Sequence, residues 1–357
     1  MLGLWLLILL VAVGRVFRLP RRVVVAMLAC LWLGIVLLLA TAPGSAAAAQ
    51  IGGSAQQWLV AGAALLLILL YRAGLRLLRS RAEARAPHQV ASPDDGMMSD
   101  AELDRYARHL VLREIGGPGQ MRLRQARVLI VGAGGLGSPV CLYLAAAGVG
   151  HITLADDDTV SLSNLQRQVI FRADQRDLLK VDAAASAMAG LNAHVSVAPH
   201  PHRITEADRD LIAAHDLVID GTDGFAARAG INAACVAAGV PLIAGAITQW
   251  EGQVTLYDPA RGGPCMACLF PVAPAAGLAP PCAEAGVIGP LPGVIGSLMA
   301  LEAIKHLTGA GQGLRGQMMI FDGLYGETRM IRTKARGDCA VCGETGAGPL
   351  ESGRGAA

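Results

Sequence analysis

The pattern of apolar and polar residues divides the chain into two unlike parts. Up to residue 80 the apolar residues form long unbroken runs, whereas from residue 99 they form short runs separated by glycine-rich turns and alanine-rich stretches. Short buried runs that alternate with helices are typical of an α/β fold with a parallel sheet. We therefore expect a membrane segment over 1–80, a linker over 81–98, a folded α/β domain over 99–345 and a disordered tail over 346–357.

Two apolar runs in the first part are long enough to cross a bilayer. Residues 23–42 carry no charge and would extend about 30 Å as a helix, which matches the hydrocarbon thickness of a membrane. A second span is expected over about 55–71, with Trp58 and Tyr71 at its two interfaces, so that a short uncharged turn joins the spans into a transmembrane hairpin. The run 2–13 is shorter, and two alternatives stay open for it, a third span or an interfacial helix.

The arginines give this hairpin an orientation. Four of them, within 15–22, precede the first span, and five, within 72–85, follow the second. By the positive-inside rule both flanks face the cytoplasm, which predicts a multi-pass protein of the inner membrane whose second part is cytoplasmic. The alternative is a secretory signal with its cleavage site at 46–49, which leaves the second apolar run unexplained.

Composition and charge agree with this division. Hydrophobic residues make up 53% of the chain, more than an ordinary soluble enzyme contains. The first 98 residues carry nine Arg and no Lys against three acids, a balance of +6, so the rest of the chain carries −4 of the net charge of +2. A mildly acidic second part lacks the basic face that nucleic-acid binding requires, and we expect no nucleic-acid partner.

A glycine-rich turn organises the second part. The apolar run 127–131 has the character of a buried strand, and it breaks at once into G-A-G-G-L-G, followed by a small-residue helix over 138–147. In such a strand–turn–helix unit, glycines let backbone amides approach phosphate, and the helix N-terminus favours its negative charge. The glycines that would hold the phosphates are Gly132, Gly134, Gly135 and Gly137.

An acid follows at the position that binds a ribose. A second strand over 152–155 ends on Asp156, 24 residues after Gly132, where a carboxylate can hold the ribose hydroxyls of a nucleotide. Most turns of this type bind dinucleotides, so an NAD-dependent oxidoreductase stays open as an alternative.

The loop after Asp156 favours a different nucleotide. Residues 161–168 have the sequence S-L-S-N-L-Q-R-Q, whose Asn164 and Arg167 can return toward nucleotide phosphates, and a dinucleotide enzyme needs no arginine there. From about Ser99 to Gly343 the chain resembles the HesA/MoeB/ThiF family, the molybdopterin-synthase and thiamine-pathway adenylyltransferases that are related to ubiquitin-activating enzymes. The S-L-S-N-L-x-R-Q run is specific to that family.

The resemblance implies a reaction and its participants. A ubiquitin-like sulfur-carrier protein places its C-terminal Gly-Gly tail in the site, and the terminal carboxylate attacks the α-phosphorus of ATP to give an acyl-adenylate and pyrophosphate. An α-carboxylate has a pKa of about 3.5, so this nucleophile is already ionised and needs no general base. The implied cofactors are ATP and Mg²⁺, and the implied assembly is a homodimer.

The resemblance also assigns roles to single residues. The residues implied to hold the charged phosphates are Asn164, Arg167 and Lys180. Asp223 is implied to hold Mg²⁺, and Arg108 to reach the site of the other subunit. In some members of the family the residue at Cys282 accepts the acyl group or sulfur. From the residues alone, surface positions for Arg108 and Lys180 and a small loop residue at Cys282 remain alternatives. The chain departs from the family pattern at His109, where the family has Gln, at Leu179 for Pro and at Gly224 for Asn. The last two departures leave open a membrane-tethered binding module with a degenerate nucleotide site.

The eight cysteines include two C-x-x-C pairs. Two such pairs close a tetrahedral zinc site, and because four thiolates leave no open position, the Zn²⁺ would be structural. Two disulfides are the alternative, which a cytoplasmic location disfavours. The paired cysteines are Cys265 with Cys268 and Cys339 with Cys342, and the cysteines of apolar helices, expected in the core, are Cys30, Cys141 and Cys235.

The remaining pattern completes the predicted fold. The sequence S-x-x-E at Ser99 is a capping box that opens a helix through Leu110. The alternation of strands and helices beyond it predicts a Rossmann-like, doubly wound sheet with additional C-terminal strands. Further strands are expected over 194–198, 217–220, 241–245, 253–257, 315–321 and 328–332, and further helices over 180–191, 206–214, 225–238 and 292–307.

Overall fold

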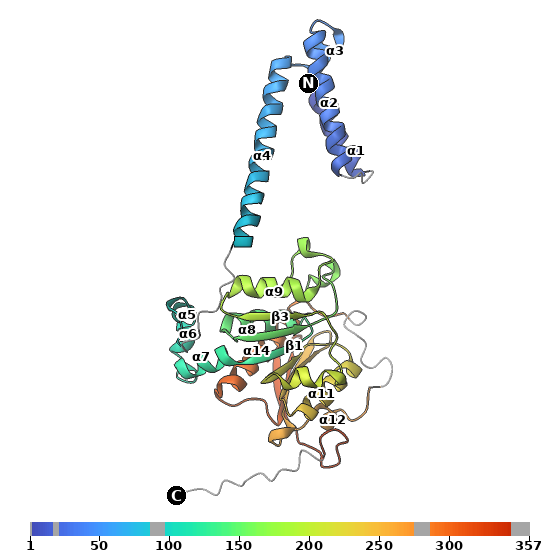
Figure 1. Ribbon diagram of the computed structural model, residues 1–357. Helices are drawn as coiled ribbons and strands as arrows, with labels where there is room; N and C mark the ends of the chain where they lie inside the picture. The colour runs from blue at the N-terminus through green and yellow to red at the C-terminus, as the bar shows by residue number, and fades with distance from the viewer. Residues whose placement is uncertain (1, 17–20, 86–96, 275–285, 344–357) are drawn as a thin grey trace. The chain divides into compact units, whose positions relative to one another are not determined.

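The computed structural model contains two compact units (Figure 1). It describes the whole chain except residues 1, 17–20, 86–96, 275–285 and 344–357, and its contacts divide the chain into Met1–Met97 and Met98–Ala357. Cys282 and the tail expected over 346–357 therefore lie outside the described residues.

The first unit is made of apolar helices. Two of them are long and apolar enough to cross a membrane, over Val23–Thr41 and Ala55–Arg72, and the first has the length and composition of a signal sequence as well. The helices are α1 (Leu2–Val16), α2 (Arg21–Thr41), α3 (Ala46–Ile51) and α4 (Ala55–Arg85).

The connection between α2 and α4 differs from the simple turn expected there. Ser45 caps α3 by accepting a hydrogen bond from the Ala48 amide at 3.2 Å, and the buried side chains of Ala48 and Ile51 pack in a small apolar cluster with Trp58. A short helix forms because these apolar residues find partners on α2 and α4, a tertiary effect that composition alone does not reveal. At its other end α4 continues to Arg85, so the first five residues of the expected linker over 81–98 are helical.

The second unit contains an eight-stranded sheet with the order β3-β2-β1-β4-β5-β6-β7-β8. The five strands from β3 to β5 are parallel, and β6, β7 and β8 continue the sheet in antiparallel fashion. The chain runs outward from β1 to β3 and returns to place β4 on the other side of β1, so the carboxyl ends of β1 and β4 form the switch point where such sheets bind ligands. The strands are β1 (Arg127–Val131), β2 (His151–Ala155), β3 (Ser196–His200), β4 (Leu217–Asp220), β5 (Leu242–Ile247), β6 (Glu251–Tyr257), β7 (Gln317–Asp322) and β8 (Glu327–Arg332).

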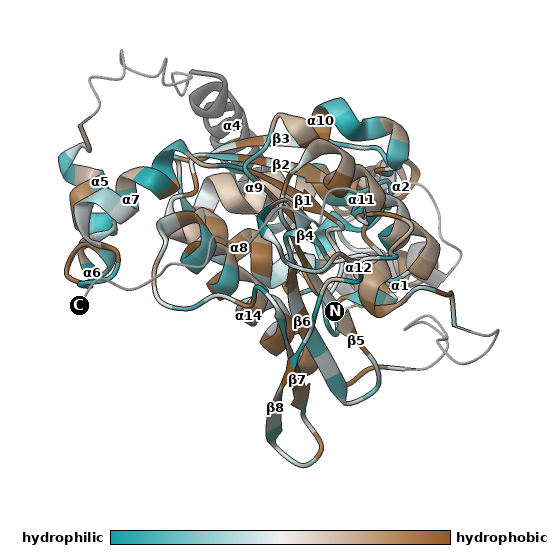
Figure 2. Ribbon diagram, turned by 90° about the horizontal axis from the view of Figure 1, so that it is seen from below, coloured by the Kyte–Doolittle hydropathy of each residue, from teal (hydrophilic) through white to brown (hydrophobic). Residues whose placement is uncertain are grey.

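Helices cover both faces of the parallel strands (Figure 2). On one face Val128 and Ile130 of β1 pack with α8, α9 and α14, and on the other face Leu129 and Val131 pack with α10, α11 and α12. Both faces of β1 are buried, which explains its unbroken apolar run, and the doubly wound α/β arrangement is confirmed. The helices are α8 (Gly137–Ala147), α9 (Lys180–Leu191), α10 (Arg209–Ala213), α11 (Phe225–Ala238), α12 (Met266–Leu269) and α14 (Pro290–Thr308).

Several element boundaries depart from the predicted ones. The helix expected from Ser99 to Leu110 begins with the predicted capping box but breaks at Tyr106 into α5 (Asp100–Arg105) and α6 (Ala107–Leu110). Tyr106 is buried, and its hydroxyl accepts a hydrogen bond from Asn192 Nδ2 at 2.8 Å. Burial of the ring therefore determines the backbone conformation at which the helix breaks. The glycine-rich α7 (Gly116–Gln125) was not predicted because Gly and Pro disfavour a helix interior.

Candidate functional site

The glycine-rich turn leaves β1 at the switch point. Gly132 has a φ of 93°, and a Cβ there would lie 3.2 Å from the carbonyl carbon of Gly221, which follows β4. A Cβ at Gly137 would lie 1.8 Å from the Gly132 carbonyl oxygen, so a larger residue cannot occupy that position without opening the turn. The tight turn delivers the N-terminus of α8 to the edge of the sheet, where the positive end of the helix dipole favours a phosphate.

The Asp156 side chain is hydrogen-bonded to this turn. Its Oδ2 accepts a hydrogen bond from the Ala133 amide at 2.7 Å, and its Oδ1 accepts one from the Asp158 amide at 2.8 Å. The structure therefore brings the predicted ribose-binding acid and the predicted phosphate-binding turn together.

Lys180 is buried, contrary to the solvated alternative. Only 3% of the residue is exposed at the start of α9, and its Nζ donates a hydrogen bond to Asp158 Oδ2 at 2.8 Å. The Asp158 side chain is 63% exposed, so the buried ammonium is paired with a carboxylate that water can reach. Because the Asp158 amide is also hydrogen-bonded to Asp156, the lysine lies on the same side of the switch point as Asp156.

Arg167 lies over the glycine-rich turn. A Cβ at Gly135 would lie 3.6 Å from Arg167 Cγ, and the guanidinium donates to Asn164 Oδ1 at 2.9 Å. Asn164 thus orients the arginine, in addition to any contact of its own with a nucleotide. Sequence reasoning did not single out Gln168, which is 4% exposed and whose Nε2 would lie 3.7 Å from a Cβ at Gly134.

The turn after β4 carries Asp223, which is exposed. The residue that shapes this turn is Asp220, which sequence reasoning missed and which is fully buried. Asp220 Oδ1 accepts hydrogen bonds from the Thr222 amide at 2.9 Å and the Thr222 hydroxyl at 2.7 Å, while Oδ2 accepts one from Arg228 Nε at 3.2 Å. A charged residue that closes an apolar strand, with an arginine eight positions later, was the available signal.

Arg108 is exposed on α6, and no contact among the described residues joins it to the glycine-rich turn. Its neighbour His109 stands where the family has Gln, and its Nδ1 lies 3.0 Å from Gln120 Oε1. His109 thereby joins α6 to α7, so the histidine in place of the family's Gln has a structural role in this chain.

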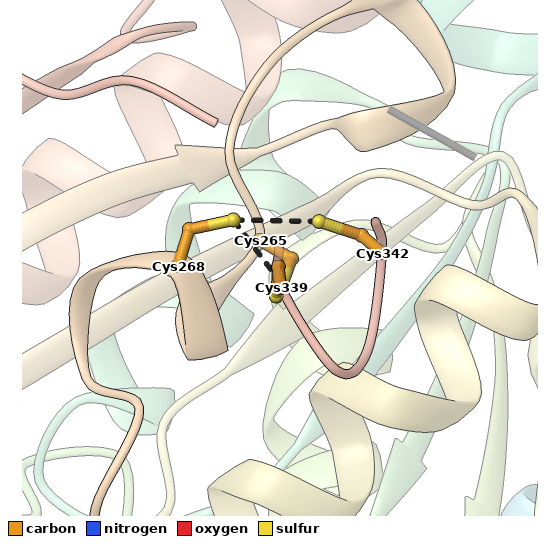
Figure 3. Close-up of side chains that lie close together, drawn as sticks. All are labelled: Cys265, Cys268, Cys339 and Cys342. Atoms are coloured by element: carbon orange, nitrogen blue, oxygen red, sulfur yellow. Dashed lines mark hydrogen bonds between the residues drawn. The ribbon is translucent and has the colours of Figure 1, made fainter. Parts of the chain in front are cut away.

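The two C-x-x-C pairs converge into one cluster (Figure 3). The Sγ atom of Cys265 lies 3.9 Å from that of Cys268 and 3.7 Å from that of Cys339. The Sγ atoms of Cys268 and Cys342 are 3.3 Å apart. Tetrahedral zinc with Zn–S bonds of about 2.3 Å requires Sγ separations of about 3.8 Å, whereas a disulfide needs about 2.0 Å. The four thiols fit a zinc ion, and the two-disulfide alternative does not describe this structure.

The thiols of the cluster differ in acidity. Burial raises the pKa of Cys265 to about 11. At Cys339, hydrogen bonds from the Cys342 and Val341 amides, together with those from the Cys268 and Cys265 thiols, outweigh burial and lower the pKa to about 7. Outside the cluster, Cys141 and Cys235 are core residues as expected, but Cys30 is exposed on α2, so the prediction for it was wrong.

A comparison with known families assigns this architecture. The sequence profile described as "ThiF family" matches residues 106–341, about two thirds of the chain. The chain belongs to the ThiF family. The resemblance drawn from the S-L-S-N-L-x-R-Q run is thereby confirmed.

Named relatives extend over most of the second unit of this ThiF-family chain. It is 43% identical over 251 residues to the SAMP-activating enzyme E1 of Haloferax volcanii, covering 70% of this chain and 92% of that protein. It is also 43% identical over 248 residues to the sulfur carrier protein adenylyltransferase of Thermus thermophilus, covering 68% and 92%. The match to the adenylyltransferase and sulfurtransferase MOCS3 of Bos taurus is 42% over 278 residues, covering 77% of this chain and 61% of MOCS3.

Solved structures agree on the fold. Escherichia coli MccB with MccA-N7isoASN superposes with a TM-score of 0.60 at 25% identity, covering 67% of this chain and 74% of MccB. MccB with ATP gives 0.59 at 24% identity, covering the same shares of the two chains.

Proposed function

We propose that this chain is an ATP-dependent adenylyltransferase that activates the C-terminal glycine carboxylate of a ubiquitin-like sulfur-carrier protein and releases pyrophosphate. The observation that carries the proposal is the grouping of Asp156, Arg167 and Lys180 around the glycine-rich turn at the switch point. Two relatives that share 43% of their aligned residues with this chain are named for carrier activation or adenylation, which disfavours the NAD-dependent alternative.

The proposed reaction requires charge neutralisation rather than proton transfer. The carrier carboxylate is ionised at neutral pH, so the site needs no general base. Arg167 is fixed over the turn by Asn164, and the ammonium of Lys180 is buried, where its charge is screened less than in water. Both cations stabilise the phosphate oxygens while the carboxylate attacks and pyrophosphate leaves.

The cofactors and the assembly belong to the same proposal. Asp223 is the proposed ligand of Mg²⁺, because such ions are held by one or two carboxylates together with substrate phosphates, and the bound ion would neutralise part of the phosphate charge. The cysteine cluster is the proposed site of a structural zinc ion, supported by its Sγ separations. Arg108 is proposed to reach the nucleotide site across a homodimer, consistent with its exposed position on α6.

The location of the chain is a further part of the proposal. The helices over Val23–Thr41 and Ala55–Arg72 are proposed to cross the inner membrane as a hairpin, with arginine-rich flanks in the cytoplasm. The catalytic unit is then cytoplasmic, where ATP is available.

Exchange of labelled pyrophosphate into ATP tests the proposed reaction. The full-length chain should catalyse it only when a small carrier protein ending in Gly-Gly, encoded in the same genome, is present. Arg167→Ala should lower the exchange rate by roughly 10²-fold, the scale for removing one transition-state contact. Arg172→Ala should not, because the Arg172 side chain is exposed and pairs with the exposed carboxylate of Asp174. Measurable NAD binding without exchange for any carrier would overturn the proposal.

A further inference from the structure

Helix α11 contacts the first cysteine pair. The amide of Met266, which lies between Cys265 and Cys268, donates a hydrogen bond to Asn232 Oδ1 at 2.8 Å. Asn232 is 2% exposed and lies in the middle of α11, so this bond is shielded from water. The helix therefore fixes the position of the backbone that carries half of the cysteine cluster.

The same helix contacts the turn after β4. Arg228 lies one helical turn before Asn232 on the same face of α11, and its guanidinium pairs with the fully buried Asp220. The other oxygen of that carboxylate holds the amide and hydroxyl of Thr222, which sets the path of the turn that presents Asp223. Asp220 therefore joins α11 to the turn through one side chain.

Tyr257 contributes to the packing around these contacts. It is 3% exposed and belongs to the same buried apolar cluster as Ile231 of α11 and Met266 of α12. The region that α11 joins to the first cysteine pair is therefore closely packed, so a shift of α12 is transmitted to α11.

We propose that Arg228 and Asn232 are positioning residues through which the cysteine cluster and the Asp223 turn are coupled, so that an intact cluster favours nucleotide binding. The inference rests on the proposed function, because it assumes that ATP binds at the switch point. The coupling works through the position of α11 and not through contact with the nucleotide: Asn232 fixes α11 against α12, and Arg228 fixes it against Asp220.

Asn232→Ala in the full-length chain tests the coupling, because it removes the acceptor of the Met266 amide and leaves all four thiols in place. Elemental analysis should still find zinc at the level of the unmodified chain. Amide hydrogen exchange in residues 221–225 should become faster, and calorimetry should record ATP binding, with Mg²⁺ present, weakened by about 5-fold or more, the lower end of typical coupling between sites.

Ile231→Val is the matched control. Ile231 is the fully buried neighbour of Asn232 on α11, so this variant weakens the core packing of the helix without removing a hydrogen bond. It should leave both the exchange in residues 221–225 and the affinity for ATP close to those of the unmodified chain. Equal effects of the two variants would overturn the coupling and leave only general destabilisation of α11.

The coupling between the zinc site and the ATP site can also be measured without a variant of Asn232, because such coupling acts equally in both directions. If the cluster favours nucleotide, saturating ATP must tighten zinc by the same factor, about 5-fold or more, in a competition with a chelator. Gly137→Ala, which is expected not to bind ATP, controls at the same ATP concentration for zinc held by ATP itself. Unchanged zinc affinity in a chain that binds ATP would overturn the coupling alone, whereas absence of ATP binding would overturn the proposed function and the coupling with it.

Discussion

Replacing Lys180 with Ala should lower carrier-dependent pyrophosphate exchange by roughly 10²-fold while leaving the fold intact. At an effective dielectric constant of about 20, an ammonium about 4 Å from a unit of phosphate charge gains about 4 kcal/mol. Part of this gain is lost because the ammonium must leave Asp158, with which it makes a 2.8 Å contact before the nucleotide binds. A net of about 2.7 kcal/mol corresponds to a 10²-fold change in rate.

The stability of the same variant separates chemistry from folding. The Asp158 carboxylate is 63% exposed, so after the substitution it is solvated rather than buried without a partner. We expect the free energy of unfolding to fall by about 1 to 3 kcal/mol, because the carboxylate stays solvated while the buried methylene groups of Lys180 lose their contacts. Exchange kinetics and thermal melting of the purified full-length chain measure the two effects. Unchanged exchange would remove Lys180 from the site, and a loss of activity that tracks a large fall in Tm would refute the electrostatic reasoning.

Three further predictions follow from the cluster, the turn and the helices of the first unit. Cys268→Ser should lose zinc, measured by elemental analysis, and lower Tm by roughly 5 °C or more, because metal binding and folding are linked; a folded, active protein without zinc would contradict this. Gly137→Ala should abolish ATP binding measured by calorimetry, because its Cβ would lie 1.8 Å from a carbonyl oxygen, whereas Gly190→Ala, with open space around it, should bind ATP normally. A truncation that starts at Met98 should be soluble, dimeric and able to form acyl-adenylate, and a reporter between α3 and α4 should be external while one at the C-terminus is cytoplasmic; an external C-terminus would favour the secretory signal.

The parts of the structure that the sequence predicted are those governed by local pattern. The strand at 127–131, the glycine-rich turn and the helix over Phe225–Ala238 follow from apolar periodicity and glycine placement, and they agree with the structure. The position of Asp156 followed from its distance along the chain after Gly132, because the first βα unit has a nearly fixed length.

The parts that the sequence did not predict depend on residues that are distant along the chain. The burial of Lys180 depends on Asp158, which is 22 residues earlier, and the break at Tyr106 depends on a hydrogen bond from Asn192. The ion pair of Asp220 with Arg228 becomes visible only when α11 is folded back on β4. In each case the sequence shows a polar residue that can form a hydrogen bond or an ion pair, but the tertiary fold determines which residue it pairs with.

The contact between Gly132 and Gly221 has a consequence for how this fold can change. The turns that follow β1 and β4 are packed directly against each other. A Cβ on Gly132 would lie 3.2 Å from the Gly221 backbone, and a Cβ on Gly221 would lie 3.2 Å from the amide nitrogen of Gly137. A library that randomises one turn while holding the other fixed should therefore yield few functional members. Variants with an altered glycine-rich turn should instead require compensating changes in the turn after β4, so the two segments form a single unit for directed evolution.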